Sequence, residues 1–460
     1  MPRSPDPLDL CLLKMKEKGL PASARESFAF YHRQASRGET GLIPERDISP
    51  VPPHEITRAE DLKGFRDSGR RAVKKSAAII LNGGIGTGMG LSCPKSLVPV
   101  KDGRSFLEII IARAQKDPAR LVLMNSFRTH EQTRRALARM NPPTPPGMFV
   151  QRQFPKILAE NHQPARWQAD PEMEWNPPGH GDLYMALYSS GMLESLLKQG
   201  VAYAFVSNAD NVGASLDPDL LGYFAEKSLP FMMEAAERTR RDSKGGHIAR
   251  DTNGALILRE SSQVPEQDRI WFSDIKRHRF FNTNNLWINL EFLREFIQKN
   301  KMIRLPLILN PKPVCPKDPD SPPVHQIETA AGSAISLFEG ARALRVPRSR
   351  FRPVKTCGDL LALRSDRFFF KKNGLVPSPG AQNSPIEINL DPRHYGNLDS
   401  FEKRFSKGVP SLAACRSLEV EGDVFFEKGV TLKGHVAIRN RSGKPAAVRG
   451  VVADREIVFD

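Results

Sequence analysis

Residues 81–96 form a glycine-rich stretch whose composition suits nucleotide binding. The apolar run 77–81 leads into five glycines within eight positions, namely Gly83, Gly84, Gly86, Gly88 and Gly90. A strand that runs into such a loop brings bare backbone N–H groups against phosphate or a base. Lys95 adds a cation a few residues later. Because a single tight turn needs only one or two glycines, the pattern favours a nucleotide loop over a turn without ligand.

The loop differs from two common nucleotide signatures. In a G-x-G-x-x-G fingerprint that starts at Gly84, the third glycine position holds Met89. In a Walker A loop, Pro94 stands where glycine is required. Proline lacks the N–H and fixes φ, so the usual phosphate nest would not form.

A carboxylate follows a second apolar run. Asp210 comes just after residues 203–207 and is flanked by Asn208 and Asn211. Magnesium takes few carboxylates together with phosphate oxygens and water. Asp210 therefore suits a metal shared with a triphosphate, while an Asp-Asn turn cap remains the alternative.

The elements around these residues alternate between strands and helices. We expect strands at 77–81, 121–124, 203–207 and 231–234. Ser105 and Glu108 have capping-box spacing for a helix through about Gln115, and Thr129 repeats the device before a helix that ends near Met140. The alternation predicts an α/β fold with a mostly parallel, doubly wound sheet. Ligands bind such sheets beyond the carboxyl ends of the strands, where both motifs fall.

Near the C-terminus the apolar period becomes six. The two interleaved series are Leu418, Val424, Val430, Val436 and Val420, Phe426, Leu432, Ile438. The spacing predicts short turns of a parallel β-helix, with an ordinary β-hairpin as the alternative. An open apolar end of such a structure favours pairing with another subunit.

Charge alone does not identify a partner. The 460 residues include 68 basic and 52 acidic side chains, a net charge of +16. Such an excess is found in nucleic-acid-binding proteins, but here the basic residues are spread along the chain. A protein that binds triphosphate, pyrophosphate and sugar phosphate would also be basic.

The remaining composition predicts a cytoplasmic protein of two or three domains. No apolar run approaches the roughly 18 residues of a membrane span, and the first residues lack the apolar core of a signal peptide. The five cysteines are scattered and include no C-x-x-C pair, which fits a reducing compartment.

Several further motifs follow the glycine loop along the chain. They are Pro177-Pro178-Gly179-His180-Gly181-Asp182, Phe205-Val206-Ser207-Asn208-Ala209-Asp210-Asn211, Lys244-Gly245-Gly246, Asn282-Thr283-Asn284-Asn285-Leu286-Trp287, Glu328-Thr329-Ala330 and Val346 to Thr356. Together with the glycine loop, these motifs resemble those of the eukaryotic-type UTP–glucose-1-phosphate uridylyltransferases. The resemblance spans roughly residues 40–440.

The resemblance implies a domain plan. We expect an N-terminal helical or irregular segment at 1–75 and a nucleotidyltransferase catalytic domain at 76–365. A linker and helix at 366–415 would lead to a C-terminal left-handed parallel β-helix-like domain at 416–460. Homo-oligomers would form through that last domain.

The resemblance also implies the reaction. An oxygen of glucose 1-phosphate attacks the α-phosphorus of UTP and releases pyrophosphate, giving UDP-glucose, with no nucleic acid and no membrane involved. The attacking phosphate is already ionised, so catalysis rests on in-line positioning and charge neutralisation. Lys95 and Lys355 match the family's catalytic lysines, and Asp210 would hold Mg²⁺.

The family motifs assign two sets of binding residues. The nucleotide set comprises Leu81, Asn82, Gly83, Gly84, Lys95, Gln151, Gly179, Asn208, Asp210 and Lys355. The sugar-phosphate set comprises His180, Gly246, Asn282, Asn284 and Glu328. We expect Trp287 to pack in the core, and Arg348 and Arg350 either to add charge at the site or to form structural pairs.

Some positions depart from the family pattern. Ile85 and Gly88 replace the usual leucine and serine of the loop, Ser92-Cys93 replaces Lys-Gly, and Arg152 and Gln153 follow Gln151. These departures leave the choice of sugar open, with a broader UDP-sugar pyrophosphorylase or a UDP-N-acetylhexosamine pyrophosphorylase as alternatives. The net charge of +16 motivates a third alternative, a catalytically silent nucleotide- or nucleic-acid-binding protein, against which Lys95, Asp210 and Lys355 argue.

Overall fold

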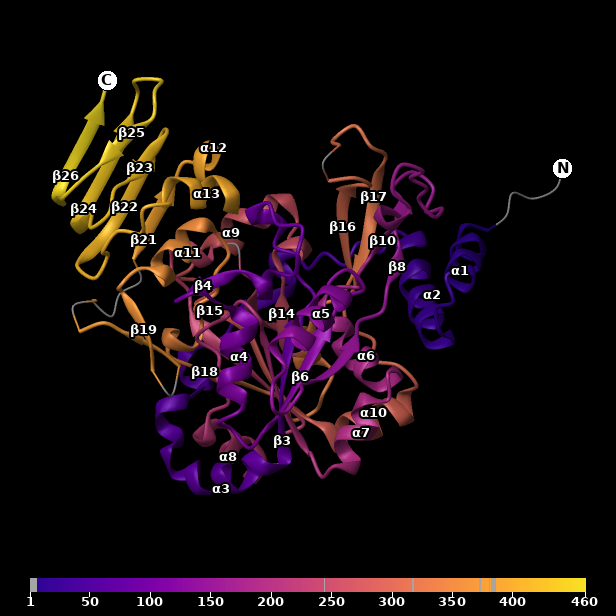
Figure 1. The fold of residues 1–460 in the computed structure, drawn as a ribbon. Coiled ribbons are helices and arrows are strands. Elements are labelled where there is room, and N and C mark those ends of the chain that lie inside the picture. The colour runs from indigo at the N-terminus through magenta and orange to yellow at the C-terminus, as the bar shows by residue number, and fades with distance from the viewer. Residues whose placement is uncertain (1–5, 244, 317, 372–373, 380, 382–385) are drawn as a thin grey trace.

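The computed structural model describes residues 6–460 except 244, 317, 372–373, 380 and 382–385 (Figure 1). Lys244, the first residue of one motif above, therefore lies outside the described residues. No helix in the described part of the chain is long and apolar enough to cross a membrane.

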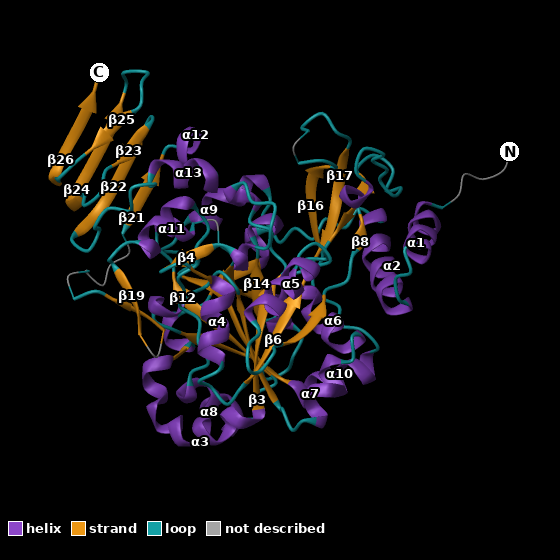
Figure 2. Cartoon of the chain, in the orientation of Figure 1, coloured by secondary structure: helices purple, strands orange, loops and turns teal. Residues whose placement is uncertain are grey.

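An 11-stranded sheet forms the centre of the molecule (Figure 2). Eight of its strands follow the order β2-β18-β12-β15-β11-β3-β6-β7, and β1, β13 and β14 extend it beside β15. The strands are β1 (Ile48–Pro50), β2 (Thr57–Arg58), β3 (Ser76–Asn82), β6 (Arg120–Asn125), β7 (Gly147–Val150), β11 (Tyr203–Asn208), β12 (Phe231–Glu237), β13 (His247–Asp251), β14 (Leu256–Arg259), β15 (Phe280–Asn289) and β18 (Arg342–Arg345).

The expected mostly parallel sheet is confirmed. β11, β3, β6 and β7 are parallel neighbours, and β12, β18 and β2 form a second parallel group. β15 joins the two groups and is antiparallel to both. The four strands expected from sequence correspond to β3, β6, β11 and β12.

Helices cover both faces of the sheet because neighbouring side chains of a strand point to opposite sides. On β3, Ile79 belongs to a buried cluster that includes residues of α6, α7 and α10, whereas Ile80 belongs to one that includes residues of α4 and α5. The helices are α1 (Pro7–Glu17), α2 (Ala22–Ser36), α3 (Arg66–Ala72), α4 (Phe106–Ala114), α5 (His130–Met140), α6 (Leu183–Ser189), α7 (Met192–Lys198), α8 (Pro218–Glu226), α9 (Arg269–Ser273), α10 (Leu290–Asn300), α11 (Cys357–Arg364), α12 (Pro392–Tyr395) and α13 (Leu398–Arg404).

A smaller lobe lies beside the N-terminal helices. β9 (Ile157–Leu158) pairs with β17 (Pro323–Glu328), which pairs with β16 (Ile308–Pro313), while β8 (Phe154–Pro155) pairs with β10 (Trp175–Asn176). Figure 1 shows α1 and α2 against this lobe, and Phe28, Phe154 and Trp175 share one buried cluster.

Parallel strands gather at the C-terminal end of the chain. One sheet has the order β21-β22-β24-β26 and a second pairs β23 with β25. The eight apolar residues of the six-residue series are all buried. The strands are β21 (Glu387–Leu390), β22 (Cys415–Glu421), β23 (Val424–Phe426), β24 (Thr431–Asn440), β25 (Ala446–Val448) and β26 (Val451–Phe459); two short hairpins elsewhere are β4 (Pro99–Lys101) with β5 (Arg104–Ser105) and β19 (Phe368–Lys371) with β20 (Gly374–Pro377).

One of the two predicted helix caps is confirmed and the other is wrong. Ser105 and Glu108 make the expected capping box of α4, whose C-cap is Gln115. α5 ends at Met140 as expected, but Thr129 makes no side-chain cap. Instead, Oγ1 of Thr129 donates to the carbonyl of Asn82 (2.8 Å), because the end of β3 lies beside this turn.

Candidate active site

Four neighbouring parallel strands end at the same edge of the central sheet. β11, β3, β6 and β7 lie side by side, and their loops carry the Asn208–Asp210 turn, the glycine loop, Ser126 and Gln151. In Figure 2 the strands run toward the side on which the C-terminal strands and the β16–β17 hairpin lie. Ligands of open α/β sheets bind beyond this edge, so the candidate site lies there.

The glycine loop folds back on itself after β3. The backbone N–H of Lys95 donates to the carbonyl of Gly84 (3.1 Å). Gly86 and Gly90 both have a φ of +68°, in the left-handed region that favours glycine. Apart from Gly84 itself and its two neighbours in the chain, no described heavy atom lies within 4 Å of a Cβ placed on Gly84. The backbone is therefore open to a close ligand at Gly84.

Gln151 lies against the start of the glycine loop. A Cβ on Gly83 would stand 3.3 Å from Oε1 of Gln151, so the missing side chain lets the amide approach. Oγ of Ser126 donates to the carbonyl of Gly83 (2.9 Å). The amide of Gln151 offers both a donor and an acceptor, as recognition of a uracil edge requires. Leu81 is half-buried against the core of the sheet.

The side chain of Asn82 is used within the fold. Its Nδ2 donates to Oδ1 of Asn125 (2.7 Å) and to Oγ1 of Thr133 (3.1 Å). These bonds use the amide donors of Asn82 and fix the end of β3.

Lys95 and Asp210 form an ion pair at the carboxyl edge. Nζ of Lys95 lies 2.5 Å from Oδ2 of Asp210, and the two side chains are only 15% and 18% exposed. Limited solvent strengthens such a pair relative to one at the surface. Lys95, which we expect to bind the phosphates, and Asp210, which we expect to bind the metal, therefore lie next to each other at the carboxyl edge.

The donor set around Asp210 suits magnesium rather than zinc. Within the described ranges, no three His, Cys, Asp or Glu side chains gather as a metal cluster. Magnesium needs only one or two protein carboxylates when phosphate oxygens and waters complete its shell. Asp210, beside the glycine loop, fits that requirement.

The segment that carries Lys355 is hydrogen-bonded to the Asp210 turn. The backbone N–H of Val354 donates to the carbonyl of Asp210 (3.1 Å), and Asn211 pairs with Pro353 as a β-bridge. The backbone N–H of Lys355 donates to Oδ2 of Asp359 (2.9 Å) at the start of α11. The fold thus brings Lys355 beside Asp210 from a distant part of the sequence.

Asn208 and Asn284 form a second polar pair. Nδ2 of Asn284 donates to Oδ1 of Asn208 (2.9 Å). Asn284 has a φ of +59°, and its buried Oδ1 has no hydrogen-bond partner among the residues that the structure describes. Asn282 is half-exposed: its Oδ1 accepts from the N–H of Asn284 (2.8 Å), and its Nδ2 would lie 2.8 Å from a Cβ on Gly332.

Glu260 is a candidate that the sequence analysis missed. A Cβ on Gly246 would stand 2.4 Å from Oε2 of Glu260, so the glycine leaves space for this carboxylate. Burial raises the pKa of Glu260 to about 7, and the nearby charge of Lys355 lowers it. In the sequence, Glu260 is marked only as a carboxylate two positions after the apolar run 256–258, and only the fold brings it to Gly246 and Lys355.

The raised pKa of Glu260 predicts a stability change with pH. The folded chain holds this proton more tightly than the unfolded chain, so the stabilisation is full at low pH and is lost as pH rises through about 7. We expect Glu260→Gln to reduce the drop in melting temperature between about pH 6 and about pH 8. Calorimetry at both pH values, with the exposed Glu266→Gln as control, measures it. An equal drop in wild type and Glu260→Gln would contradict the assignment.

Gly179 and His180 form a wall of the site with the loop after β17. Gly179 has a φ of +74°, and a Cβ there would stand 2.4 Å from the carbonyl oxygen of Thr329. Nδ1 of His180 accepts from the N–H of Ala331 (2.9 Å). Burial lowers the pKa of His180 to about 4. The imidazole is therefore neutral near pH 7, with its proton on Nε2.

Glu328 lies beside Gly179 and is bonded within the small lobe. Its Cβ would be 3.2 Å from a Cβ on Gly179. Oε1 of Glu328 accepts from Nδ2 of Asn310 (3.1 Å) on β16. Burial raises the pKa of Glu328.

Trp287, Arg348 and Arg350 have structural partners. Trp287 is fully buried, as expected. Arg348 pairs with Asp242 (2.6 Å) and Arg350 with the buried Glu234 (2.6 Å). Of the two alternatives for these arginines, the structure favours structural pairing.

The C-terminal region packs against both the glycine loop and the segment that carries Lys355. Met89 of the glycine loop is buried in the cluster that includes α11 and the C-terminal strands. A Cβ on Gly90 would stand 2.6 Å from Cβ of Asn397, and one on Gly358 of α11 would stand 3.0 Å from the carbonyl oxygen of Ile388. The same packing therefore fixes the glycine loop and the helix that follows Lys355.

Known proteins resemble this chain over nearly its whole length. The family model described as UTP--glucose-1-phosphate uridylyltransferase matches residues 25–433. The uridylyltransferase of Encephalitozoon cuniculi is 36% identical over 451 residues, covering 95% of this chain and 88% of the relative. That of Solanum tuberosum is 36% identical over 400 residues, covering 84% and 82%.

Solved structures of related proteins indicate the same family. The UDP-glucose pyrophosphorylase of Leishmania major, known in open and closed forms, superposes with a TM-score of 0.92 at 39% identity, covering 98% of this chain and 99% of that one. The Trypanosoma brucei protein gives 0.90 at 41% identity, with the same coverage. The chain belongs to the UTP–glucose-1-phosphate uridylyltransferase family.

Proposed function

We infer that this chain forms UDP-glucose and pyrophosphate from UTP and glucose 1-phosphate, reversibly. The family gives the substrates, and a variant of the L. major relative was solved in complex with UDP-glucose. The observation in this chain that carries the inference is the meeting of Lys95, Asp210 and the Lys355 segment beside the glycine loop.

The site suits in-line transfer between two phosphates. The phosphate oxygen of glucose 1-phosphate is ionised near pH 7, so a strong general base is not required. Catalysis depends instead on alignment and on positive charge near the α-phosphate and the leaving pyrophosphate. We assign that charge to Lys95 and Lys355, and phosphate contacts to the backbone of the glycine loop.

We propose that Asp210 holds Mg²⁺ during the reaction. When bound, magnesium supplies further charge neutralisation at the triphosphate. The assignment is supported by the carboxylate of Asp210, which lies beside Lys95.

We further propose two binding regions on either side of these charges. Gln151, Asn208, Gly179 and the backbone of residues 81–84 would hold the nucleotide. His180 would donate its Nε2–H to the sugar phosphate. Gly246, Asn282, Asn284, Glu328 and the additional Glu260 would hold the sugar.

Pyrophosphate release tests the reaction. We expect release from UTP only when glucose 1-phosphate and magnesium are both present. Galactose 1-phosphate and N-acetylglucosamine 1-phosphate serve as comparison substrates. A tenfold preference for either of them would mean that it, and not glucose 1-phosphate, is the substrate. UTP binding without any release of pyrophosphate would indicate a silent homologue.

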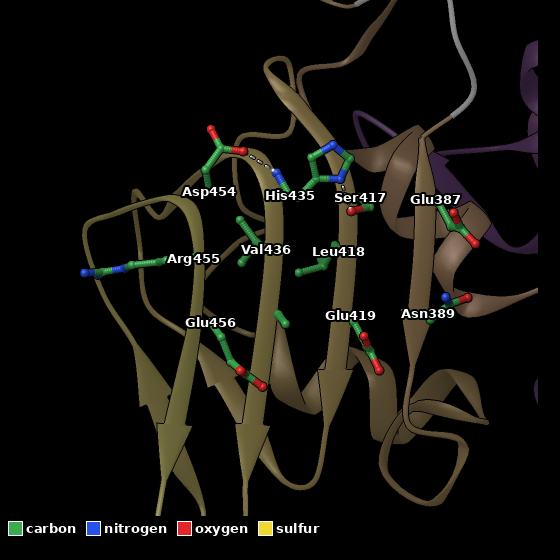
Figure 3. A pocket seen from close by; sticks show the side chains of 11 residues that line it. Glu387, Asn389, Ser417, Leu418, Glu419, His435, Val436, Asp454, Arg455 and Glu456 are labelled. Atoms are coloured by element: carbon green, nitrogen blue, oxygen red, sulfur yellow. Dashed lines mark hydrogen bonds between the residues drawn. The ribbon is translucent and has the colours of Figure 1, made fainter.

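We propose that residues 416–460 form a left-handed β-helix-like domain. The domains before it would be the N-terminal segment 1–75, the catalytic domain 76–365 and the linker and helix 366–415. Parallel pairing at a near-constant offset supports it. Leu418 of β22 pairs with Val436 of β24, and Thr431 at the start of β24 pairs with Ser411 on one side and with Val451 of β26 on the other. The outer surface is polar: Figure 3 shows Ser417, Glu419, His435 and Glu456 around a surface hollow, which no predicted site residue lines.

We also propose that copies of the chain associate through β26. β26 pairs only with β24 among the described strands, and Val451 and Val458 are 59% and 42% exposed. Open strand edges of this kind favour further pairing. We expect Val458→Lys to lower the solution mass measured by light scattering at high protein concentration. A monomeric wild type would contradict the proposal.

We place the reaction in the cytoplasm. All five cysteines are free, as is usual for proteins of reducing compartments.

A further inference from the structure

Arg152 joins three separate segments of the chain. Its backbone N–H donates to Oδ2 of Asp182 (2.6 Å), and its Nε donates to Oδ1 of the same carboxylate (2.6 Å). Its Nη1 donates to the carbonyl of Ser23 (3.1 Å) and to Oγ of Ser27 (2.9 Å) on α2. The side chains of Arg152 and Asp182 are 8% and 0% exposed.

Each end of this connection lies next to a candidate binding residue. Arg152 follows Gln151 directly, so any movement of its backbone moves the amide that lies against Gly83. Asp182 closes the loop that holds Gly179 and His180, with its N–H donating to the carbonyl of Gly179 (3.3 Å). One carboxylate–guanidinium pair therefore sets the separation of the two loops.

The third segment is firmly held by its own contacts. α2 packs through Phe28 against Phe154, with ring centroids 5.4 Å apart. The hydroxyl of Tyr31 donates to the carbonyl of Leu305 (3.1 Å). α1 is joined to the same lobe through Lys14, which pairs with Glu174. The helical hairpin is thus a rigid support for the guanidinium.

We propose that Arg152 is a positioning residue for the uridine nucleotide and that the α1–α2 hairpin acts on the nucleotide site through it. The inference rests on the proposed function, because the proposed function assigns the nucleotide to Gln151 and to the loop that holds Gly179 and His180. Only a guanidinium has the fork needed to reach the carboxylate and Ser27 together; an ammonium at the same position would reach one of them. Misplaced binding groups weaken both affinity and base discrimination.

Two conservative variants test the proposal. We expect Ser27→Ala to raise the KM for UTP about 3- to 10-fold, the worth of one hydrogen bond, with little change in kcat. Arg152→Lys should raise it further and lower the kcat/KM preference for UTP over CTP. A preference ratio does not depend on how much of the protein is folded, so a merely structural role would leave it unchanged.

Matched controls lie on the same helix. Ser36→Ala removes a hydroxyl bonded to His32, and Arg25→Lys changes a guanidinium bonded to the carbonyl of Leu20. Neither touches Arg152, so both should keep the wild-type KM. If Ser27→Ala and Arg152→Lys also keep the wild-type KM and base preference, the proposal is overturned. A wild-type chain that neither binds nor uses UTP would instead overturn the proposed function.

Discussion

Replacing Lys355 with alanine is expected to lower kcat about 10²- to 10³-fold, the loss typical when one electrostatic group at a transition state is removed. Lys355 is exposed, and its backbone rather than its ammonium is used to start α11. The substitution should therefore leave the fold intact. Initial rates of pyrophosphate release at saturating substrates measure the effect.

Two further variants make the Lys355 result specific. Lys355→Arg keeps the charge and should recover part of the lost rate. Lys299→Ala removes an exposed lysine of α10, a helix that begins beside the start of β11 rather than beside its carboxyl end, and should be as fast as wild type. Near-normal turnover of Lys355→Ala with an unchanged melting temperature would remove Lys355 from the catalytic assignment.

Local patterns were enough to predict four strands of the central sheet, β3, β6, β11 and β12, and its carboxyl edge. β3 and β11 contain the apolar runs 77–81 and 203–206, each followed by polar residues, and a buried parallel strand has that composition. The site edge follows from the strands alone, since ligands of such sheets bind at one edge.

The partners of individual site residues could not be predicted in the same way. Glu260 reaches Gly246 only because β13 and β14 pair as a hairpin, and no spacing in the sequence records where that hairpin lies. Asn82 and Asn282 belong to family motifs, yet their side chains are bonded within the fold. Residue type does not show which way an amide points; packing decides it.

The ion pair between Lys95 and Asp210 predicts the second large effect. Asp210→Asn should lower kcat about 10²- to 10³-fold and raise the magnesium concentration needed for half-maximal rate, because an amide is a weaker ligand for this ion. The exposed Asp9→Asn on α1 is the charge-matched control. A normal magnesium requirement in Asp210→Asn would contradict a metal role.

Lys95 and Asp210 should also behave as one unit. Each single alanine variant leaves the other charge with little solvent and no partner, so part of its loss reflects that unpaired charge. The double variant Lys95→Ala/Asp210→Ala removes both charges together. We expect it to be about as slow as the slower single variant and to have a melting temperature closer to wild type than either. Fully additive losses in ln(kcat) would mean that the two side chains act independently, because residues in contact within one site show coupled effects.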